Sequence, residues 1–418
     1  GHKVIGMDID QEKISFLEST YSPTVYEPGL KETYQRCKSK IRFTSKYDDV
    51  TGNCDTLVVT VGTPWGESDK PDINSLNQVV AGISGGLCKG QLIVLRSTVT
   101  PGTTLRIGEE IQKATGFRLD EDIFLSFCPE RTIEGIALHE LYNLPNIIGG
   151  IGPNSSKKTE VLFENLGPRS IIVKSPTHAE LCKLVDNMYR ALNIGFANEL
   201  GSICENVGVD SYEIVSAVNS AYSRTTVFRP GLGADGPCLS KDPLILRYFA
   251  RNFGIATPII ESAIEVNRTS TIRVAKDLKE FVKINKISKP TIAFLGLAFK
   301  GMPETDDLRG APSTSIFEEI DGDLEFVSKY SPTYQFYDPI IRKFYGYDVS
   351  DDLEYVLNHA NVVLFLNNHP SLMNFPFHML RDSTKRPLLI FDSWHNVKLS
   401  EDSFDSSGIT FLRVGDGT

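Results

Sequence analysis

One glycine-rich segment of the sequence carries residues suited to thiol chemistry. It runs from Arg229 to Pro243 and places three glycines within eight residues before Cys238, with Lys241 and Asp242 following. Glycines let a backbone approach a ligand closely. A helix N-terminus and a nearby ammonium group both lower the pKa of a thiol, and the thiolate is the nucleophile. An aspartate one turn further on can position or deprotonate water. The segment therefore predicts a nucleophilic cysteine.

The alternative for Cys238 is a small buried side chain, which is the usual state of a free cysteine. The other six cysteines keep that interpretation, because none has such a context. Seven scattered cysteines without a C-x-x-C pair indicate neither a disulfide framework nor a zinc ribbon, and they fit a reducing compartment. The seven histidines form no H-E-x-x-H motif, so we expect no metal site.

A second pair of polar residues, Lys183 and Asn187, lies four positions apart within an apolar pattern of helical period. This spacing puts both side chains on one helix face, where both can donate hydrogen bonds to a developing oxyanion. The alternative is an ordinary polar stripe on an amphipathic helix.

An acid closes the first apolar run, Val4 to Asp8. At the end of a strand in a dinucleotide-binding sheet, an acid accepts hydrogen bonds from ribose hydroxyls and repels a 2′-phosphate, which favours NAD over NADP. The alternative is an aspartate that caps the following helix, expected over 12–20. The glycine-rich turn that normally precedes such a strand is absent from this sequence. We therefore expect the sequence to be part of a longer chain; otherwise its cofactor site lacks a central strand.

The elements that must position these residues form two similar series. Short apolar runs followed by turns and helical stretches predict parallel sheets covered on both faces. The first series has runs at 3–7, 56–61, 92–95 and 123–127, and the second at 291–296, 334–337, 362–366 and 388–391. Between them, from about 177 to 285, the pattern changes to long helices. The predicted fold is α/β, with two doubly wound Rossmann-like lobes and the first βα unit missing. The expected domains are 1–176, 177–288 and 289–418.

Composition limits the class of protein. A chain of 418 residues is long enough for two or three domains. Its 43 basic and 53 acidic side chains give a formal charge of −10, which argues against nucleic acid or an anionic membrane as the main partner. No apolar run approaches the length of a membrane span, and the first residues have no signal-peptide pattern.

Motifs along nearly the whole chain occur in the order of one known family. They are Tyr26-Glu27-Pro28-Gly29-Leu30, Val61-Gly62-Thr63-Pro64, Ser97-Thr98-Val99 with Pro101-Gly102, Cys128-Pro129-Glu130-Arg131 with Glu134-Gly135, Glu180 to Lys183 with Asn187, the Cys238 segment, Gly296 to Lys300, and Thr305 to Arg309. In these motifs the chain resembles the nucleotide-sugar 6-dehydrogenases of the UDP-glucose/GDP-mannose dehydrogenase family, and within it the UDP-N-acetyl-D-mannosamine dehydrogenase branch.

The resemblance implies a four-electron oxidation of a sugar C6 alcohol to a carboxylate with two NAD⁺. Cys238 would attack the aldehyde from the first hydride transfer, and the resulting thiohemiacetal would be oxidised to a thioester that water hydrolyses. The resemblance also implies a homodimer built on the long central helix, and a cytoplasmic role in the synthesis of polysaccharide precursors.

Roles for individual residues follow from the same resemblance. The implied catalytic residues are Cys238, Lys183, Asn187, Asp242, Glu130 and Thr98. The implied cofactor-binding residues are Asp8, Lys13, Thr63, Thr98, Glu134, Lys241 and Arg309. The implied substrate-binding residues are Glu130, Lys183, Asn187, Arg224, Gly233 and Lys300, of which Arg224 would reach the partner subunit's substrate.

Two departures from the family pattern concern the substrate. Asp235-Gly236 replaces the usual Gly-Gly before the cysteine, and Trp394 replaces the arginine of a C-terminal Asp-x-Arg. Trp394 would either pack on a ring or fill space. Residues 193–200 and Asp242-Pro243 resemble the UDP-N-acetylmannosamine branch, which favours a UDP-N-acetylhexosamine as substrate, with UDP-glucose as the first alternative.

Two other classes of protein stay open at this point. A non-catalytic nucleotide-sugar binding module would tolerate the missing N-terminal unit, but retention of Cys238, Lys183, Asn187 and Asp242 together disfavours it. A two-electron hydroxyacid dehydrogenase also joins a Rossmann lobe to helices, but it needs no thiol. A Cys238→Ser substitution separates that class from the thioester mechanism.

Overall fold

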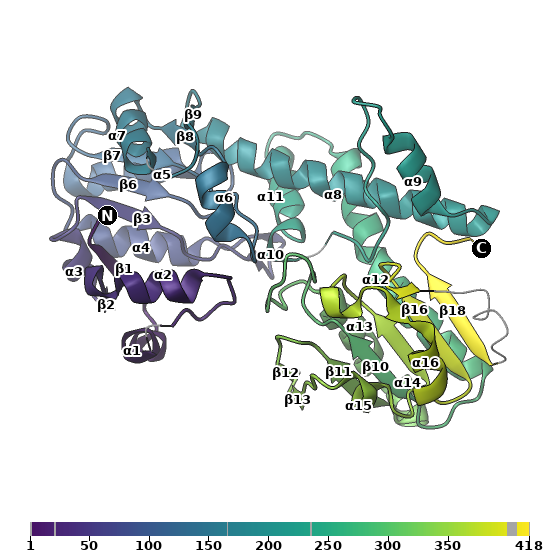
Figure 1. Cartoon of the computed structure of the whole chain (residues 1–418). Coiled ribbons are helices and arrows are strands. Elements are labelled where there is room, and N and C mark those ends of the chain that lie inside the picture. Colours follow the sequence, from purple (N-terminus) through teal and green to yellow (C-terminus); the bar gives the residue numbers. More distant parts are fainter. Residues whose placement is uncertain (1, 21, 165, 235, 399–407, 418) are drawn as a thin grey trace. The chain divides into compact units, whose positions relative to one another are not determined.

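A computed structural model gives the structure of the chain and describes residues 2–20, 22–164, 166–234, 236–398 and 408–417. Asp235 lies outside the described residues. The chain divides into two compact units (Figure 1). Unit 1 comprises residues 1–187 and 244–256, and unit 2 comprises 188–243 and 257–418.

Unit 1 is built around a five-stranded sheet in the order β3-β6-β7-β8-β9. Its strands are β3 (Thr56–Val59), β6 (Leu92–Leu95), β7 (Phe124–Phe127), β8 (Ile147–Gly150) and β9 (Ile171–Ile172). β3, β6 and β7 run parallel, as predicted from their apolar runs, whereas β8 pairs antiparallel with β7. β6 and β7 are buried along their whole length, because helices cover both faces.

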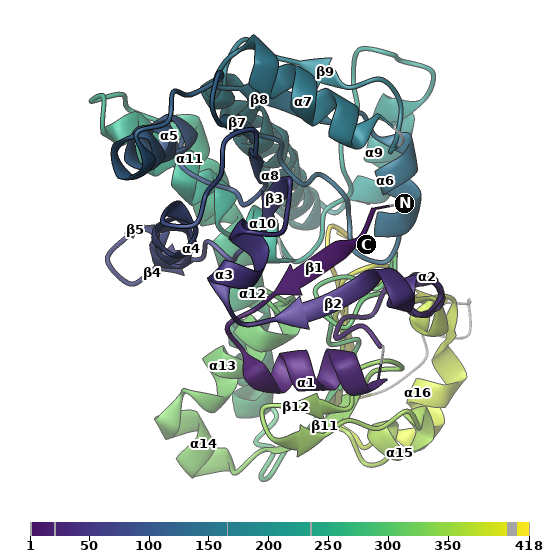
Figure 2. The same cartoon turned by 90° about the vertical axis from the view of Figure 1, so that its left-hand side faces the viewer.

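The first strand belongs to a separate pair of parallel strands, β1 (Val4–Met7) and β2 (Ile41–Thr44), seen next to each other in Figure 2. A cavity of about 460 Å³ is lined both by β1, through Ile5 and Met7, and by residues 56–59 of β3. Among the described residues, one edge of β1 and one edge of β3 therefore carry no partner strand.

The helices that precede α8 in the chain all belong to unit 1. They are α1 (Gln11–Thr20), α2 (Leu30–Cys37), α3 (Tyr47–Thr51), α4 (Asn74–Ser84), α5 (Thr103–Thr115), α6 (Ala137–Asn143) and α7 (Pro153–Phe163), with a 3₁₀ turn at Lys38–Lys40. A short hairpin joins β4 (Trp65–Gly66) to β5 (Lys70–Pro71).

Unit 2 contains a parallel five-stranded sheet in the order β11-β10-β14-β16-β18. Its strands are β10 (Thr291–Leu295), β11 (Thr333–Tyr337), β14 (Val362–Phe365), β16 (Leu388–Asp392) and β18 (Ile409–Arg413). The chain passes from β10 to β11 on one side and returns to β14 on the other. The carboxyl ends of β10 and β14 therefore flank a topological switch point, where ligands of such sheets bind.

Alternating side chains of this sheet enter two cores. Ile292 and Phe294 pack with residues of α12 (Pro258–Ile284) and α13 (Pro312–Asp321), whereas Ala293 and Leu295 pack with residues of α15 (Leu353–Leu357) and α16 (Phe377–Ser383). Both faces of the sheet are thus covered, which confirms the doubly wound prediction for this lobe.

The remaining elements of the chain are helices and small strand pairs. They are α8 (Pro176–Val207), α9 (Ser211–Asn219), α10 (Gly236–Leu239), α11 (Asp242–Arg251), α14 (Leu324–Tyr330), a 3₁₀ turn at Pro370–Leu372, β12 (Lys343–Phe344) with β13 (Tyr347–Asp348), and β15 (Phe375–Pro376) with β17 (Val397–Lys398). α8 confirms the long helix predicted after residue 177. No helix in the described part of the chain is long and apolar enough to cross a bilayer.

Candidate active site

The thiol loop, residues 229–243, is anchored on two helices of unit 2. The Gly231 N–H donates to Oδ1 of Asn198 on α8 (2.7 Å), and Asn198 is 6% exposed. The Asn198 amide donates in turn to Oδ1 of Asn267 on α12 (3.4 Å), whose own amide donates to the Ala191 carbonyl (2.9 Å). A relay of two side-chain amides therefore fixes the start of the loop.

Glycine is required at two further places in the loop. At Gly233 (φ 109°) a Cβ would lie 2.6 Å from the Asn267 carbonyl oxygen, and at Gly236 (φ 83°) it would lie 2.7 Å from the Phe299 ring. The Gly236 N–H donates to the Gly310 carbonyl (3.0 Å). The backbone thus packs against α12 at one point and against the segment after β10 at the other, so these glycines allow close packing within the protein; their predicted approach to a ligand stays a prediction.

Cys238 lies in this loop with a half-buried free thiol. It is the third residue of α10, which is a single helical turn. A helix this short has only a small dipole, so the helix N-terminus predicted at the thiol contributes little. The ammonium of Lys241 lies 3.1 Å from a carboxylate oxygen of Asp242, which is fully buried at the start of α11. The lysine and aspartate predicted around the thiol thus form an ion pair.

The segment after β10 carries the substrate-side residues expected in unit 2. Lys300 is half-buried beside the Phe299 ring, 5.4 Å from its centre. The next two backbone N–H groups donate to Asn368 Oδ1, after β14 (3.0 and 3.1 Å), which joins the two loops at the switch point. Arg309 is mostly exposed and paired with Asp307 at 2.6 Å. It lies in the turn before α13.

Arg224 lies in the segment between α9 and the thiol loop. Its guanidinium stands over the Tyr222 ring at 4.8 Å, and both side chains are exposed.

In unit 1, Asp8 lies just beyond the carboxyl end of β1. Its carboxylate is 2.6 Å from Lys13 Nζ. Burial acts to raise the pKa of Asp8, but the hydrogen bonds from Lys13 and from the backbone outweigh it, so the pKa lies below its usual value. Asp10 rather than Asp8 caps α1, because Asp10 Oδ1 accepts from the N–H groups of Glu12 and Lys13. The capping alternative for Asp8 is therefore wrong.

Asp8 and its neighbours suit the ribose of a dinucleotide. The anionic, one-third exposed carboxylate can accept two hydroxyl hydrogen bonds, and Asp8, Lys13 and Gly62 all line the 460 Å³ cavity. These residues fit NAD.

Thr63 and Thr98 follow neighbouring strands, and the structure joins them directly. The Thr63 hydroxyl donates to the Thr98 carbonyl (2.6 Å), and the Ser97 hydroxyl donates to the Val61 carbonyl (2.6 Å). Carboxyl ends of parallel strands meet at one edge of a sheet, which explains why motifs distant in sequence come together.

Glu130, after β7, is held by a residue that the sequence did not reveal. Its carboxylate lies 2.6 Å from Arg96 and accepts the backbone N–H groups of Arg131 and Thr132. Burial acts to raise the pKa of Glu130, but Arg96 and the Thr132 N–H lower it by more than burial raises it. The pKa of Glu130 therefore lies below its usual value, and the carboxyl group is anionic at neutral pH. The sequence did offer one signal for this role of Arg96, namely its position directly before the Ser97-Thr98 motif. Glu134 is half-buried in the turn before α6.

Lys183 and Asn187 lie on α8 within unit 1 and are 8% and 1% exposed. One turn earlier, the buried Glu180 accepts the Gly102 N–H (2.6 Å) and both the N–H and hydroxyl of Thr104 (2.8 and 2.6 Å). Glu180 therefore ties this part of α8 to the start of α5 and fixes the side chains that follow it.

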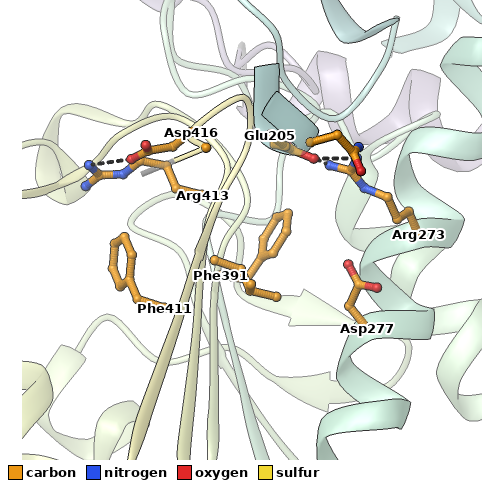
Figure 3. A pocket seen from close by; sticks show the side chains of 10 residues that line it. Glu205, Arg273, Asp277, Phe391, Phe411, Arg413 and Asp416 are labelled. Atoms are coloured by element: carbon orange, nitrogen blue, oxygen red, sulfur yellow. Dashed lines mark hydrogen bonds and ion pairs between the residues drawn. The ribbon is translucent and has the colours of Figure 1, made fainter. Parts of the chain in front are cut away.

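A separate pocket of about 490 Å³ in unit 2 lies between α8, α12 and the last strands (Figure 3). Its arginines are both paired in the wall, Arg273 with Glu205 (2.9 Å) and Arg413 with Asp416 (3.7 Å). None of the predicted site residues lines this pocket. Within the described residues, no group of three or more His, Cys, Asp or Glu side chains could hold a metal ion.

Comparison with protein families decides the class of protein. Three domain models of the UDP-glucose/GDP-mannose dehydrogenase family match the chain: the NAD binding domain at 1–167, the central domain at 177–269 and the UDP binding domain at 293–398. The chain belongs to this family. It is an NAD-dependent nucleotide-sugar dehydrogenase, an oxidoreductase.

Individual relatives are similar over nearly their whole length. The chain is 30% identical to the UDP-N-acetyl-D-mannosamine dehydrogenase of Pyrococcus horikoshii, over 93% of this chain and 89% of that protein. It is 27% identical to the UDP-glucose 6-dehydrogenase of Bacillus subtilis, over 99% and 88%.

Solved structures give the same result. The UDP-D-ManNAc dehydrogenase of P. horikoshii superposes with a TM-score of 0.87 at 27% identity, covering 100% of this chain and 94% of that one. The UDP-N-acetyl-mannosamine dehydrogenase of Staphylococcus aureus superposes with a TM-score of 0.82 at 27% identity, covering 100% and 93%.

Proposed function

We propose that this protein oxidises the C6 hydroxyl of a UDP-N-acetylhexosamine, UDP-N-acetyl-D-mannosamine in the first place, to a carboxylate through a thioester on Cys238. The observation that carries the proposal is the thiol loop, in which the half-buried thiol stands on a glycine backbone packed against the segment after β10. Similarity to UDP-N-acetyl-D-mannosamine dehydrogenases over nearly the whole chain supports this choice of sugar.

Bound NAD supplies the acceptor for one hydride from C6 in each of the two oxidations. The side chains of the protein hold the cofactor and the nucleotide sugar and supply the nucleophile. Asp8, Lys13, Thr63, Thr98, Glu134, Lys241 and Arg309 are proposed to hold the cofactor. Arg224, Gly233 and Lys300 are proposed to bind the nucleotide sugar together with Glu130, Lys183 and Asn187.

The thiolate of Cys238 attacks the C6 aldehyde and forms a carbon–sulfur bond, while the carbonyl π electrons move to the oxygen. Lys183 and Asn187 are proposed to donate hydrogen bonds to this oxyanion. Both side chains are buried, which strengthens such hydrogen bonds because little water competes for them.

The second oxidation leaves a thioester, which is electrophilic enough for water. Water adds to the carbonyl carbon, the carbon–sulfur bond breaks, and the thiolate leaves with its electron pair. Glu130 is proposed as the group that accepts the water proton, since Arg96 keeps it ionised and ready to accept. Thr98 and the buried Asp242 are proposed to orient the water molecule. The balance is one sugar, one water and two NAD⁺ consumed for one uronate, two NADH and three protons.

We further propose that the division at 1–176, 177–288 and 289–418 separates cofactor binding, helical core and nucleotide-sugar binding. The central part is proposed to form a homodimer through α8. Val185, Tyr189, Phe196 and Ile203 recur along this helix at helical spacing and are each more than half exposed. An exposed apolar stripe of this length is typical of a face that packs on a second copy.

The decisive experiment counts NADH. The protein is incubated with NAD⁺ and UDP-N-acetylmannosamine, UDP-N-acetylglucosamine, UDP-glucose or GDP-mannose, and absorbance at 340 nm is followed. We expect two NADH for each UDP-N-acetylmannosamine consumed. Two NADH only with UDP-glucose would overturn the substrate, and one NADH per sugar would overturn the thioester mechanism.

A further inference from the structure

The segment after β10 that carries Lys300 has no regular structure of its own. Residues 296–311, between β10 and α13, contain no helix and no strand. One backbone hydrogen bond, from the Phe299 N–H to the Asp307 carbonyl (3.1 Å), closes the segment into a loop. Backbone outside a helix or sheet keeps a single conformation only when other groups satisfy its N–H and C=O groups. The position of Lys300 therefore depends on contacts from elsewhere in unit 2.

The chain after β14 holds this segment through three consecutive residues, which we call the β14 loop (367–369). In its middle, Asn368 Oδ1 accepts the N–H groups of Gly301 and Met302, at 3.0 and 3.1 Å. These are the two backbone N–H groups that follow Lys300 in the chain. One side-chain oxygen thus fixes the backbone on the carboxyl side of Lys300.

The two outer residues of the β14 loop extend the contact in both directions. The amide of Asn367 donates to the Ala298 carbonyl (3.2 Å), on the amino side of Lys300. His369 is 8% exposed, and its Nε2 lies 3.1 Å from Oε1 of Glu304. The β14 loop therefore contacts the segment at three places, and Lys300 lies between the first two.

The β14 loop is itself fixed, so it can act as a support. The Asn396 amide donates to the Asn367 carbonyl (2.9 Å), and Asn367 Oδ1 accepts the His369 N–H (3.1 Å). The two chains also pack without space between them, because a Cβ on Gly301 would lie 2.0 Å from the His369 backbone nitrogen. A rigid support of this kind holds a binding residue in place before the ligand arrives.

Contacts also lead from Lys300 to the thiol loop. The Lys300 ammonium lies 5.4 Å from the centre of the Phe299 ring. A Cβ on Gly236, two residues before Cys238, would lie 2.7 Å from that same ring. The backbone that Asn368 holds is therefore one residue from a side chain that packs on the thiol loop.

We propose that Asn368 is a positioning residue of the nucleotide-sugar site, which acts through Lys300 by holding the backbone at Gly301 and Met302. This rests on the proposed role of Lys300 in binding the nucleotide sugar. Without the Asn368 oxygen, two N–H groups lose their acceptor, and the segment no longer keeps the conformation that places the ammonium group. The ligand then binds less tightly, because part of its binding energy is used to order the segment.

Equilibrium binding tests the proposal without turnover. Titration calorimetry without NAD⁺ gives the Kd of UDP-N-acetylmannosamine and of UDP-glucose. Asn368→Ala should raise the Kd of the tighter ligand about tenfold, and Asn368→Asp, which keeps an oxygen acceptor for both N–H groups, should recover most of the loss. The control is Asn358→Ala, an exposed asparagine at the end of α15, which should leave the Kd unchanged. An unchanged Kd for Asn368→Ala, or a loss that Asn368→Asp does not recover, overturns the proposal.

A double-mutant cycle tests whether Asn368 acts through Lys300. Lys300→Met removes the ammonium group and should itself raise the Kd. In this background Asn368→Ala should cost less than about twofold more, because no ammonium group is left to position. Additive losses would show that Asn368 acts by another route and would contradict the proposal.

Steady-state kinetics separate positioning from loss of folded protein. Asn368→Ala should raise KM for the sugar nucleotide about tenfold and keep kcat within about threefold, because the reacting groups themselves are unchanged. A smaller folded fraction would instead lower kcat and leave KM as it is. That second pattern would assign Asn368 a purely structural role and overturn the proposal.

The two proposals fail separately. The NADH count of the unaltered protein decides the reaction and its sugar, whatever the role of Asn368. If Lys300→Met leaves the Kd of both sugar nucleotides unchanged, the proposed binding role of Lys300 is wrong, and the role of Asn368 falls with it. If Lys300→Met weakens binding and Asn368→Ala does not, only the role of Asn368 is wrong.

Discussion

At the scale of single residues, the chemistry depends on how side chains are paired. The thiol of Cys238 is free and half-buried. The two charged residues that follow it, Lys241 and Asp242, form an ion pair with each other. Glu130 is likewise fixed by Arg96. Each of these arrangements makes a prediction that a single substitution can test.

Replacing Cys238 by serine should stop acid formation. A serine hydroxyl is far less nucleophilic at neutral pH than a thiol, so the first oxidation should persist while the uronic acid falls by at least about 10³-fold. The measurement is NADH and uronic acid formed per sugar consumed. Cys88→Ser, which changes an exposed thiol in unit 1, is the control. Unchanged acid formation in the Cys238 variant would rule out the thioester.

Replacing Arg96 by glutamine should move the acidic limb of the pH–rate profile. Arg96 lowers the pKa of Glu130, and Glu130 accepts a proton only when ionised. Loss of the guanidinium raises that pKa, so activity should disappear at a higher pH as the solution is acidified, with the rate at alkaline pH less affected. Arg96→Lys keeps the charge and should restore most of the profile. A limb that stays in place would show that Glu130 does not set it.

At the scale of elements, the thiol loop takes its shape from helices distant in the sequence. Asn198 on α8 and Asn267 on α12 hold its first residues, while Gly233 and Gly236 allow the close packing that follows. The loop is therefore positioned by side-chain amides and backbone contacts rather than by its own hydrogen bonds alone.

Asn198→Ala should loosen the loop. It leaves the Gly231 N–H without its acceptor, and such an unmade bond costs about 1–3 kcal/mol when buried. We expect kcat/KM for the sugar nucleotide to fall about tenfold or more, and the rate at which iodoacetamide alkylates Cys238 to change. The control is Asn206→Ala, an exposed position on the same helix. If both variants behave alike, Asn198 has no particular role in the loop.

At the scale of the whole molecule, the exposed stripe on α8 predicts assembly. Phe196→Glu introduces a charge into the middle of this stripe, where a second copy would bury it. We expect sedimentation to show a dimer for the parent protein and a monomer for the variant. Phe253→Glu changes another exposed phenylalanine, after α11 (67% exposed, against 55% for Phe196), and should leave the dimer intact. A parent protein that sediments as a monomer would remove this proposal.

The sequence alone determined eight of the strands, the long helix and the residue types of the site. Apolar runs as long as one strand, such as 92–95 and 362–366, are typical of strands of a parallel sheet that is covered on both faces. Both are such strands in the structure. Short motifs such as Ser97-Thr98 and the thiol loop also have a local physical meaning. Two of the missed strands were harder: β2 alternates polar and apolar residues, and β9 has only two residues.

Only the tertiary structure decided which side chains from distant elements meet. It paired Arg96 with Glu130, showed that Asp10 rather than Asp8 caps α1, joined Asn198 to Gly231, and brought Trp394 against the thiol loop. These contacts join positions far apart in the sequence, or depend on a turn of the backbone that has no fixed spacing. Periodicity reports which face of an element is buried, but not which residue of another element packs on it, because that follows from the packing of the whole sheet and its helices.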